Sequence, residues 1–449
     1  YKNNNTLIAF FGRLNVNVTD SWFLMVSARY EGSSKFGTGN QWGLFPAVGG
    51  GVDLANVLNI SAMDNLKLRV SYGVTGNQPN DSYISLLRLG PQGNFFYNGE
   101  FIPGYAPVSN PNEDLGWEKK GEFDVGVDFS LLDGQLYGSF DYYTRTTTDL
   151  IFSYPVPVPP NLYSSATLNL GEMHSSGLEL ALTWNAVNSG DFSYGVTLTP
   201  TYYLQNDLVS LSGEFNGSDL IYGVRDLGGM GAPGMSDVPL VRAEENAPIG
   251  QLWAHTFVEI DPDGNLILRD TDGNGTVSEE DRSVVGNGLP DFEFGWGNNF
   301  AYKNFDLNIF FRGVLGHDLN NTFRAFYEVP RMIGSYNLPA TALDMKNDQT
   351  GTYLNNSSGV LSSYHIEDAS YLCLDNMSLG YNFDMSGTSA FRSIRVFVSG
   401  NNLLYITGYK GVDPSVRYGD GGNPLIPGID RRNTWFRTRS VSLGVNIGL

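Results

Sequence analysis

The nine residues Val441–Leu449, VSLGVNIGL, alternate between an apolar residue and a small or polar one. Successive side chains of a β-strand point to opposite sides of a sheet, so this period of two predicts a strand with one apolar and one polar face. We therefore expect the segment to separate two different environments.

The same alternation recurs in residues 66–74, 122–131 and 305–312, where Phe310 interrupts the polar side. The strands it predicts are roughly nine to twelve residues long, whereas strands of globular proteins average about five to six. A tilted strand needs about 9–11 residues to cross a bilayer. Gly, Ser, Asn and charged residues on the second face suit a water-filled lumen. The pattern favours strands that span a membrane.

Thirteen strands are expected along the chain. Their predicted bounds are 6–17, 22–31, 44–53, 66–74, 120–131, 134–144, 173–184, 192–203, 291–301, 305–313, 372–383, 394–402 and 437–449. Shorter connections join them at one end, and long polar segments join them at the other, at about 75–119, 145–172, 204–290, 314–371 and 403–436. Outer-membrane barrels have short periplasmic turns and long outer loops. The predicted fold class is all-β, a transmembrane antiparallel β-barrel with long extracellular loops. The alternative is a large soluble all-β protein, a sandwich or a propeller.

The composition narrows the function classes. The chain has 449 residues, with 27 Lys and Arg against 47 Asp and Glu, a formal net charge of −20. This acidity argues against nucleic-acid binding, because phosphates recruit Lys and Arg. The single cysteine, Cys373, excludes an internal disulfide and a cysteine-based zinc or iron–sulfur site. The four histidines are scattered without a catalytic or metal-binding spacing, so we expect no enzymatic activity.

Residues 270–281, DTDGNGTVSEED, lie within the long outer segment 204–290 and match an EF-hand-like calcium loop. Oxygen ligands are expected from Asp270, Asp272, Asn274, Thr276 (backbone carbonyl), Ser278 (through water) and Asp281. Asp281 replaces the usual Glu at position 12, and no helix is expected before the loop. The prediction is a weak Ca²⁺ site, and the alternative is an acidic surface turn without an ion.

Aromatic residues in the predicted outer loops are the candidates for substrate contact. They are Phe95, Phe96, Tyr97, Tyr105, Tyr222 and Tyr327. Aromatic rings stack on sugar rings and on peptide side chains. The alternative is that these rings pack long loops against one another or against a partner protein.

Segments along nearly the whole chain carry a family resemblance. They are Gly12–Asn15, Ala28–Gly37 (ARYEGSSKFG), Trp42–Val48, Leu66–Gln78, Asn110–Lys119 (NPNEDLGWEK), Asp141–Ile151, Asn169–Leu180, Tyr302–Gly316, Ile366–Leu372, Gly400–Val416 and Pro427–Asp430. In this order and spacing they resemble the SusC/RagA-type TonB-dependent transporters of Bacteroidetes outer membranes. Cys373 stands where that family usually has Arg.

The resemblance implies that residues 1–449 are the C-terminal portion of a plugged barrel, about 13 of about 22 strands. The plug domain and the first strands are not visible in the sequence, and an odd number of strands is expected upstream. The implied function is TonB-dependent import of oligosaccharides or oligopeptides across the outer membrane of a Gram-negative bacterium.

The resemblance also implies several partners. A SusD-like surface lipoprotein would act as a lid, TonB–ExbB–ExbD would act through the plug, and lipid would surround the wall. A dimer of transporter–lipoprotein pairs is expected by family analogy. Two rival functions stay open at this point, a passive porin-like channel and a secreted calcium-binding β-rich adhesin.

Overall fold

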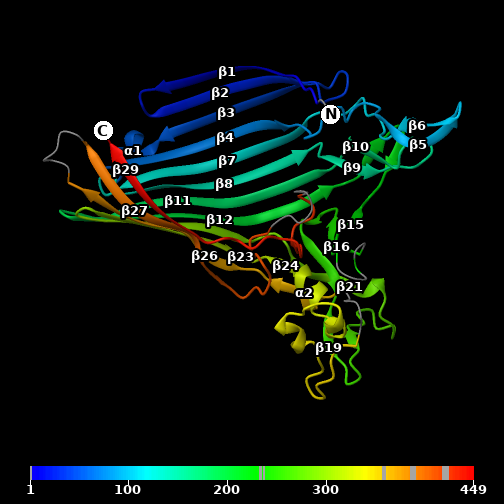
Figure 1. The fold of residues 1–449 in the computed structure, drawn as a ribbon. Coiled ribbons are helices and arrows are strands. Elements are labelled where there is room, and N and C mark those ends of the chain that lie inside the picture. Colours follow the sequence, from blue (N-terminus) through cyan, green and yellow to red (C-terminus); the bar gives the residue numbers. More distant parts are fainter. Residues whose placement is uncertain are drawn as a thin grey trace.

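A computed structural model describes residues 3–231, 235, 238–355, 361–384, 391–416 and 424–448. Within these residues, thirteen long strands follow one another in a single antiparallel sheet, which curves into an open trough (Figure 1). Their bounds are β1 Leu7–Val18, β2 Trp22–Ser33, β3 Trp42–Asp53, β4 Asn65–Asn77, β7 Glu118–Leu131, β8 Leu136–Thr148, β11 Glu172–Ser189, β12 Phe192–Ser210, β22 Phe292–Tyr302, β23 Phe305–Leu315, β26 Tyr371–Phe383, β27 Ser393–Thr407 and β29 Ser440–Gly448. We call this sheet the wall. Each predicted strand is confirmed, and Leu449 lies outside the described residues.

The pairing register lines up side chains of one kind across neighbouring strands. Val52 of β3 lies opposite Leu68 of β4, which lies opposite Val127 of β7. One residue further along, Arg69 of β4 faces Gly51 and Gly126. Because alternate residues point to opposite sides, the wall has an apolar outer face and a polar inner face.

Phe310 keeps to the inner face that its position in β23 dictates, although it is apolar. Gly297 lies opposite it on β22, and Gly295 lies two residues along the same strand. A Cβ atom at Gly295 would lie only 3.1 Å from the Phe310 ring, so the glycine there provides space for the ring. A register shift between β23 and β26 follows directly after this residue.

The two ends of the wall differ as predicted. Tight turns close one end at 19–21, 132–135, 190–191 and 303–304, and a longer connection there contains helix α1 (Leu54–Leu58). Left-handed backbone at Thr19, Asp133 and Lys303 makes such turns possible. β11 runs five residues past its predicted end, so the turn at 190–191 is shorter than expected, and β12 is extended at its other end to Ser210.

Long segments at the other end fold into structures of their own. Their strands are β5 Leu89–Tyr97, β6 Glu100–Pro107, β9 Ile151–Pro155, β10 Ser165–Asn169, β13 Gly213–Phe215, β14 Ser218–Leu220, β15 Val224–Gly229, β16 Pro239–Glu244, β17 Ala247–Pro248, β18 Gln251–His255, β19 Phe257–Ile260, β20 Leu266–Leu268, β21 Arg282–Asn287, β24 Asp318–Asn321, β25 Ile366–Asp368 and β28 Ile429–Asp430. Helix α2 spans Thr322–Tyr327, and the 3-10 turns are η1 Glu279–Asp281, η2 Pro330–Gly334, η3 Ala340–Asp344 and η4 Ser363–His365.

The described parts of residues 211–291 and 316–370 pack together, and we call them the loop lobe. The sheet β15–β16–β18–β21 and helix α2 enclose its main apolar core, in which Leu240, Val241 and Leu252 have no exposed surface. The lobe lies beyond the end of the wall in Figure 1. No helix in the described part of the chain is long and apolar enough to cross a membrane.

Candidate functional site

The inner face of the wall carries a network of charged side chains centred on Arg69. Its guanidinium donates to Asp128 at 2.8 Å and to Asp141 at 2.7 Å, and lies 3.8 Å from Asp124. Three successive strands, β4, β7 and β8, thus share one cation. These side chains are between one sixth and one third exposed. Charges on this face require water rather than hydrocarbon beside them.

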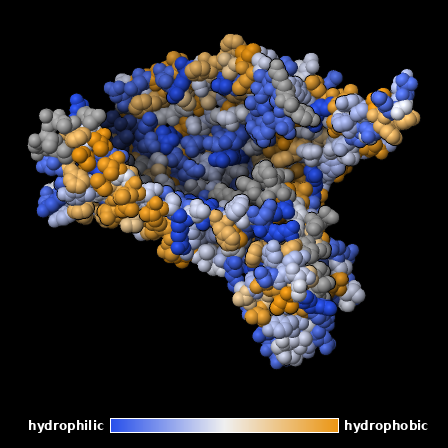
Figure 2. Space-filling view, in the orientation of Figure 1, coloured by the Kyte–Doolittle hydropathy of each residue, from blue (hydrophilic) through white to orange (hydrophobic). Residues whose placement is uncertain are grey.

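Further ion pairs follow around the inner face. Arg145 lies 3.1 Å from Glu122, and Arg395 of β27 pairs with Asp306 of β23 across the intervening strand β26. Arg312 donates to the Tyr371 hydroxyl at 2.7 Å. Figure 2 shows hydrophilic residues gathered in the hollow of the trough. The inner surface is therefore a polar lining on which solutes can be held.

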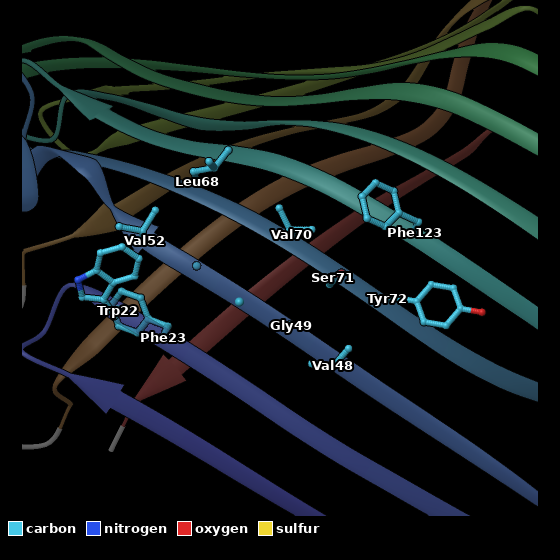
Figure 3. A pocket seen from close by; sticks show the side chains of 12 residues that line it. Trp22, Phe23, Val48, Gly49, Val52, Leu68, Val70, Ser71, Tyr72 and Phe123 are labelled. Carbon is cyan, nitrogen blue, oxygen red and sulfur yellow. The ribbon is translucent and has the colours of Figure 1, made fainter.

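The outer face is apolar and exposed. A shallow hollow of about 460 Å³ lies on this face. Its lining includes Leu68, Val70 and Tyr72 of β4 and Phe123 of the neighbouring strand β7 (Figure 3). The exposed fractions of Val70 and Tyr72 are 41% and 47%. A continuous apolar surface of this extent is not stable in water and fits contact with lipid chains. The wall aromatics Trp22, Tyr30, Tyr142, Trp184 and Trp296 are all at least 37% exposed, as side chains of an interface girdle would be.

The predicted calcium turn lies between β20 and β21, after extended chain as expected. Carboxylate oxygens of Asp270, Asp272 and Asp281 all lie within 4.8 Å of one another. Gly275 has φ +87°, which permits the sharp turn at position 6. Three like charges this close attract a cation, and the site's oxygen donors are the kind that Ca²⁺ prefers.

Backbone N–H groups already hold the carboxylates of the turn. Asp281 is buried and accepts from Ser278 at 2.7 Å and Thr271 at 2.6 Å, and these bonds lower the pKa of its carboxyl group. Asp270 accepts from Gly273 and Gly275 at 2.7 and 2.8 Å. The turn is thus preorganised by its own backbone N–H groups.

Two of the remaining predicted ligand residues, Asn274 and Ser278, make side-chain hydrogen bonds within the turn. The Asn274 side-chain oxygen accepts from the Thr276 hydroxyl at 2.7 Å, and the Ser278 hydroxyl accepts from the Glu280 N–H at 3.2 Å. Three of the six predicted ligands therefore converge through their carboxylates. The Asn274 oxygen would have to exchange its hydrogen bond to reach an ion, whereas Thr276 is predicted to bind through its backbone carbonyl and Ser278 through water.

The candidate substrate aromatics do not form one group. Phe95, Phe96, Tyr97 and Tyr105 lie on the β5–β6 hairpin, which projects away from the wall in Figure 1, and each is at least 51% exposed. Tyr222 instead packs on Tyr154, with ring centroids 5.4 Å apart.

Tyr327 lies in a third place, at the end of α2. Its ring centroid is 4.8 Å from that of Phe323, 4.6 Å from that of Phe326 and 6.1 Å from that of Tyr336. The rings of Tyr222 and Tyr327 pack loops together, whereas the hairpin presents a free apolar surface.

A buried ionic cluster in the loop lobe is a feature that the sequence did not reveal. Arg324 of α2 donates to Glu328 at 2.6 Å and also contacts Glu367, while His365 lies 3.6 Å from Glu328. Burial alone would raise the pKa of Glu328, but its interactions with His365 and Arg324 lower it to about 2. The i,i+4 spacing of Arg324 and Glu328 was the available signal.

Comparison with known proteins shows which family has this architecture. Residues 1–403 match the family model described as TonB dependent receptor-like, beta-barrel. The chain belongs to this family. Members lie in the outer membrane, so the tight turns face the periplasm and the loop lobe faces the cell exterior.

Two curated relatives and one solved structure are similar over nearly all of this TonB-dependent receptor chain. It is 31% identical to TonB-dependent receptor P3 of Formosa agariphila, over 100% of this chain and 46% of the relative. It is 29% identical to TonB-dependent receptor SusC of Bacteroides thetaiotaomicron, over 94% of this chain and 43% of the relative. The fold matches a solved structure of the RagAB peptide transporter with a TM-score of 0.83 at 22% identity, over 99% of this chain and 47% of the matched chain. The chain spans less than half the length of each.

Proposed function

We propose that this chain forms the C-terminal part of the wall of a SusC-type importer that takes up oligosaccharides or oligopeptides with energy from TonB. The observation that carries the proposal is the charged inner face centred on Arg69, in a chain of the TonB-dependent receptor family. A polar lining lets a hydrophilic solute pass, while the apolar outer face holds the wall in lipid. The proposal contains no catalytic step.

A SusD-like surface lipoprotein is the proposed extracellular partner. The β5–β6 hairpin supports this assignment, because Phe96, Phe101 and Tyr105 are 65–73% exposed outside the membrane-spanning wall. Exposed aromatic groups of this kind mark protein interaction sites. TonB–ExbB–ExbD would act through a plug domain, and a dimer of transporter–lipoprotein pairs is part of the same proposal.

Energised uptake is tested in cells that carry the complete gene. Deletion of the gene should abolish uptake of a labelled oligomer mixture, and disruption of tonB should do the same while leaving the protein in the outer membrane. A passive porin-like channel predicts uptake that persists without TonB. Uptake unchanged by either deletion would refute the proposal.

We also propose that the turn 270–281 binds Ca²⁺ weakly at the cell exterior. The convergence of Asp270, Asp272 and Asp281 supports it. Calorimetry on the intact protein should detect Ca²⁺ binding with an affinity in about the 10⁻⁴–10⁻³ M range of extracellular sites. Asp270→Asn should weaken binding, whereas Asp263→Asn in the neighbouring turn should not. The absence of any heat of Ca²⁺ binding would sink this proposal.

A further inference from the structure

A cavity of about 630 Å³ lies at the extracellular end of the wall. The segment 77–81 at the end of β4 forms one side. Residues of β7, β8, β9, β10 and β11, together with loop residues such as Ile84, form the rest. Its volume falls within the ~300–1,000 Å³ of small-ligand sites. The cavity is thus large enough for part of an oligomer.

The register of the wall shows that this cavity opens toward the lumen. Asn77 lies on the same side of β4 as Arg69, because the two are separated by an even number of residues. Glu118 lies opposite Asn77, and Thr147 of β8 lies opposite Met173 of β11. All four of these residues line the cavity. A solute that enters the mouth of the wall would meet them before the charged network around Arg69.

The walls of the cavity are held in place by hydrogen bonds. Buried Lys35 donates to the carbonyl oxygens of Pro79 and Asn80 at 2.8 and 3.0 Å, which fixes the 77–81 segment from behind. Asn77 donates to Glu118 at 3.1 Å, and Glu118 also accepts from the Ile151 N–H at 3.1 Å. A preorganised site of this kind binds ligands without first ordering its own chain.

The chemistry of the lining is mixed. Carboxylates come from Asp81 and Glu118, and apolar surface comes from Ile84, Phe152 and Met173. Asp81 is exposed and makes no hydrogen bond or ion pair with the part of the chain that the structure describes, and none of the lining residues is a Lys or Arg. The cavity therefore offers an unpaired negative charge next to apolar side chains.

We propose that this cavity binds a cationic oligopeptide, with an amino or guanidinium group at Asp81 and an apolar side chain against Ile84 and Met173. The proposal rests on the importer function and narrows its cargo. Amide and hydroxyl groups of Asn77, Gln78 and Thr147 match the donors and acceptors of a peptide backbone. The lining contains no Trp or Tyr on which sugar rings could stack, and a neutral oligosaccharide carries no cation that could pair with Asp81.

The test is calorimetric titration of the intact transporter purified from outer membranes. The probes are the hexapeptide amide Leu-Asn-Lys-Leu-Asn-Gly, the same peptide with Glu in place of Lys, and maltohexaose. The Lys peptide should bind at least about tenfold more tightly than the Glu peptide, because charge reversal replaces attraction by repulsion. Maltohexaose should not compete.

Two variants locate the effect. Asp81→Asn should reduce the difference between the two peptides to about twofold, and Ser153→Trp should fill the cavity and abolish binding of both. Asp133→Asn removes the same charge at a periplasmic turn, where the residue has φ +52° that Asn tolerates, so it should leave the difference intact.

The proposal is overturned if the Glu peptide or maltohexaose binds as tightly as the Lys peptide, or if Asp81→Asn leaves the difference unchanged. These outcomes would not touch the importer function, since binding to purified protein does not require TonB. Loss of TonB dependence in cells would refute the importer function independently.

Discussion

The wall and the loop lobe bury their apolar side chains in different places. Val398 and Leu443 on the wall are 41% and 78% exposed, whereas Leu240, Val241 and Leu252 in the lobe have no exposed surface. Lipid takes the place of a core in the wall, so apolar residues need only point outward. The lobe stands in water and must enclose its own core. The same chain thus follows opposite burial rules on the two sides of the membrane surface.

Removing the buried charge of the lobe should have the largest effect. Glu328→Gln leaves Arg324 and His365 without their shared carboxylate, and breaking a buried pair costs about 3–5 kcal/mol. Hydrogen exchange of the α2 amides should report this as easier local opening. Glu259→Gln, at an exposed position of β19, should change opening by less than about 0.5 kcal/mol.

The lowered pKa of Glu328 predicts that the loop lobe loses stability at low pH. Because its pKa is lowered to about 2, Glu328 contributes stability above its ordinary pKa near 4.5, and this contribution is lost as pH falls toward 2. Opening of α2 should therefore increase below about pH 4 in the native protein and depend less on pH in Glu328→Gln. Equal pH dependence in both proteins would contradict this assignment.

Two neighbouring residues of β27 test whether the outer face of the wall contacts lipid and the inner face contacts water. Val398 points outward and Ser399 points inward, next to the small residues Ser378 and Ser442. Val398→Arg places a charge in hydrocarbon and should cost about 2–4 kcal/mol, whereas Ser399→Arg should be tolerated. Equilibrium unfolding in detergent micelles measures both. Equal destabilisation would mean that the inner face is not hydrated.

Loss of the central inner-face cation should have a smaller effect. Arg69→Met leaves Asp124, Asp128 and Asp141 on neighbouring strands without their shared partner. These groups are partly hydrated, so we expect a cost of about 1 kcal/mol that shrinks at high salt. The comparison of unfolding at 0.05 and 1 M NaCl is decisive, because a cost that does not depend on salt would indicate a dry interior.

The β5–β6 hairpin should contribute least to stability. Phe101→Ser removes a ring that is already 73% exposed and packs on the exposed ring of Phe96, at 5.2 Å between centroids, so stability should change by less than about 0.5 kcal/mol. Capture of the proposed lipoprotein on the purified transporter should weaken severalfold. Unchanged capture would remove the hairpin from the proposed interface.

Sequence patterns located the wall because its signal is local. The alternation within each strand shows which residues lie on each of its two faces, and all thirteen strands are predicted near their observed bounds. The extensions of β11 to Ser189 and β12 to Ser210 were missed, because register shifts near Gly177 and Trp184 interrupt the alternation. The calcium turn was visible for the same local reason, although its occupancy stays a prediction.

The loop lobe and the lumenal cavity were not visible in the sequence. Strand β24 pairs with β28 more than 100 residues later, and Arg324 meets Glu367 from a different segment. Such contacts depend on how distant segments pack, which a local pattern does not record. The alternation of residues determined the wall and its two faces, and the lengths of the connections indicated its orientation. Only the tertiary structure decided which loop side chains meet, and so where a charged cavity opens above the inner face.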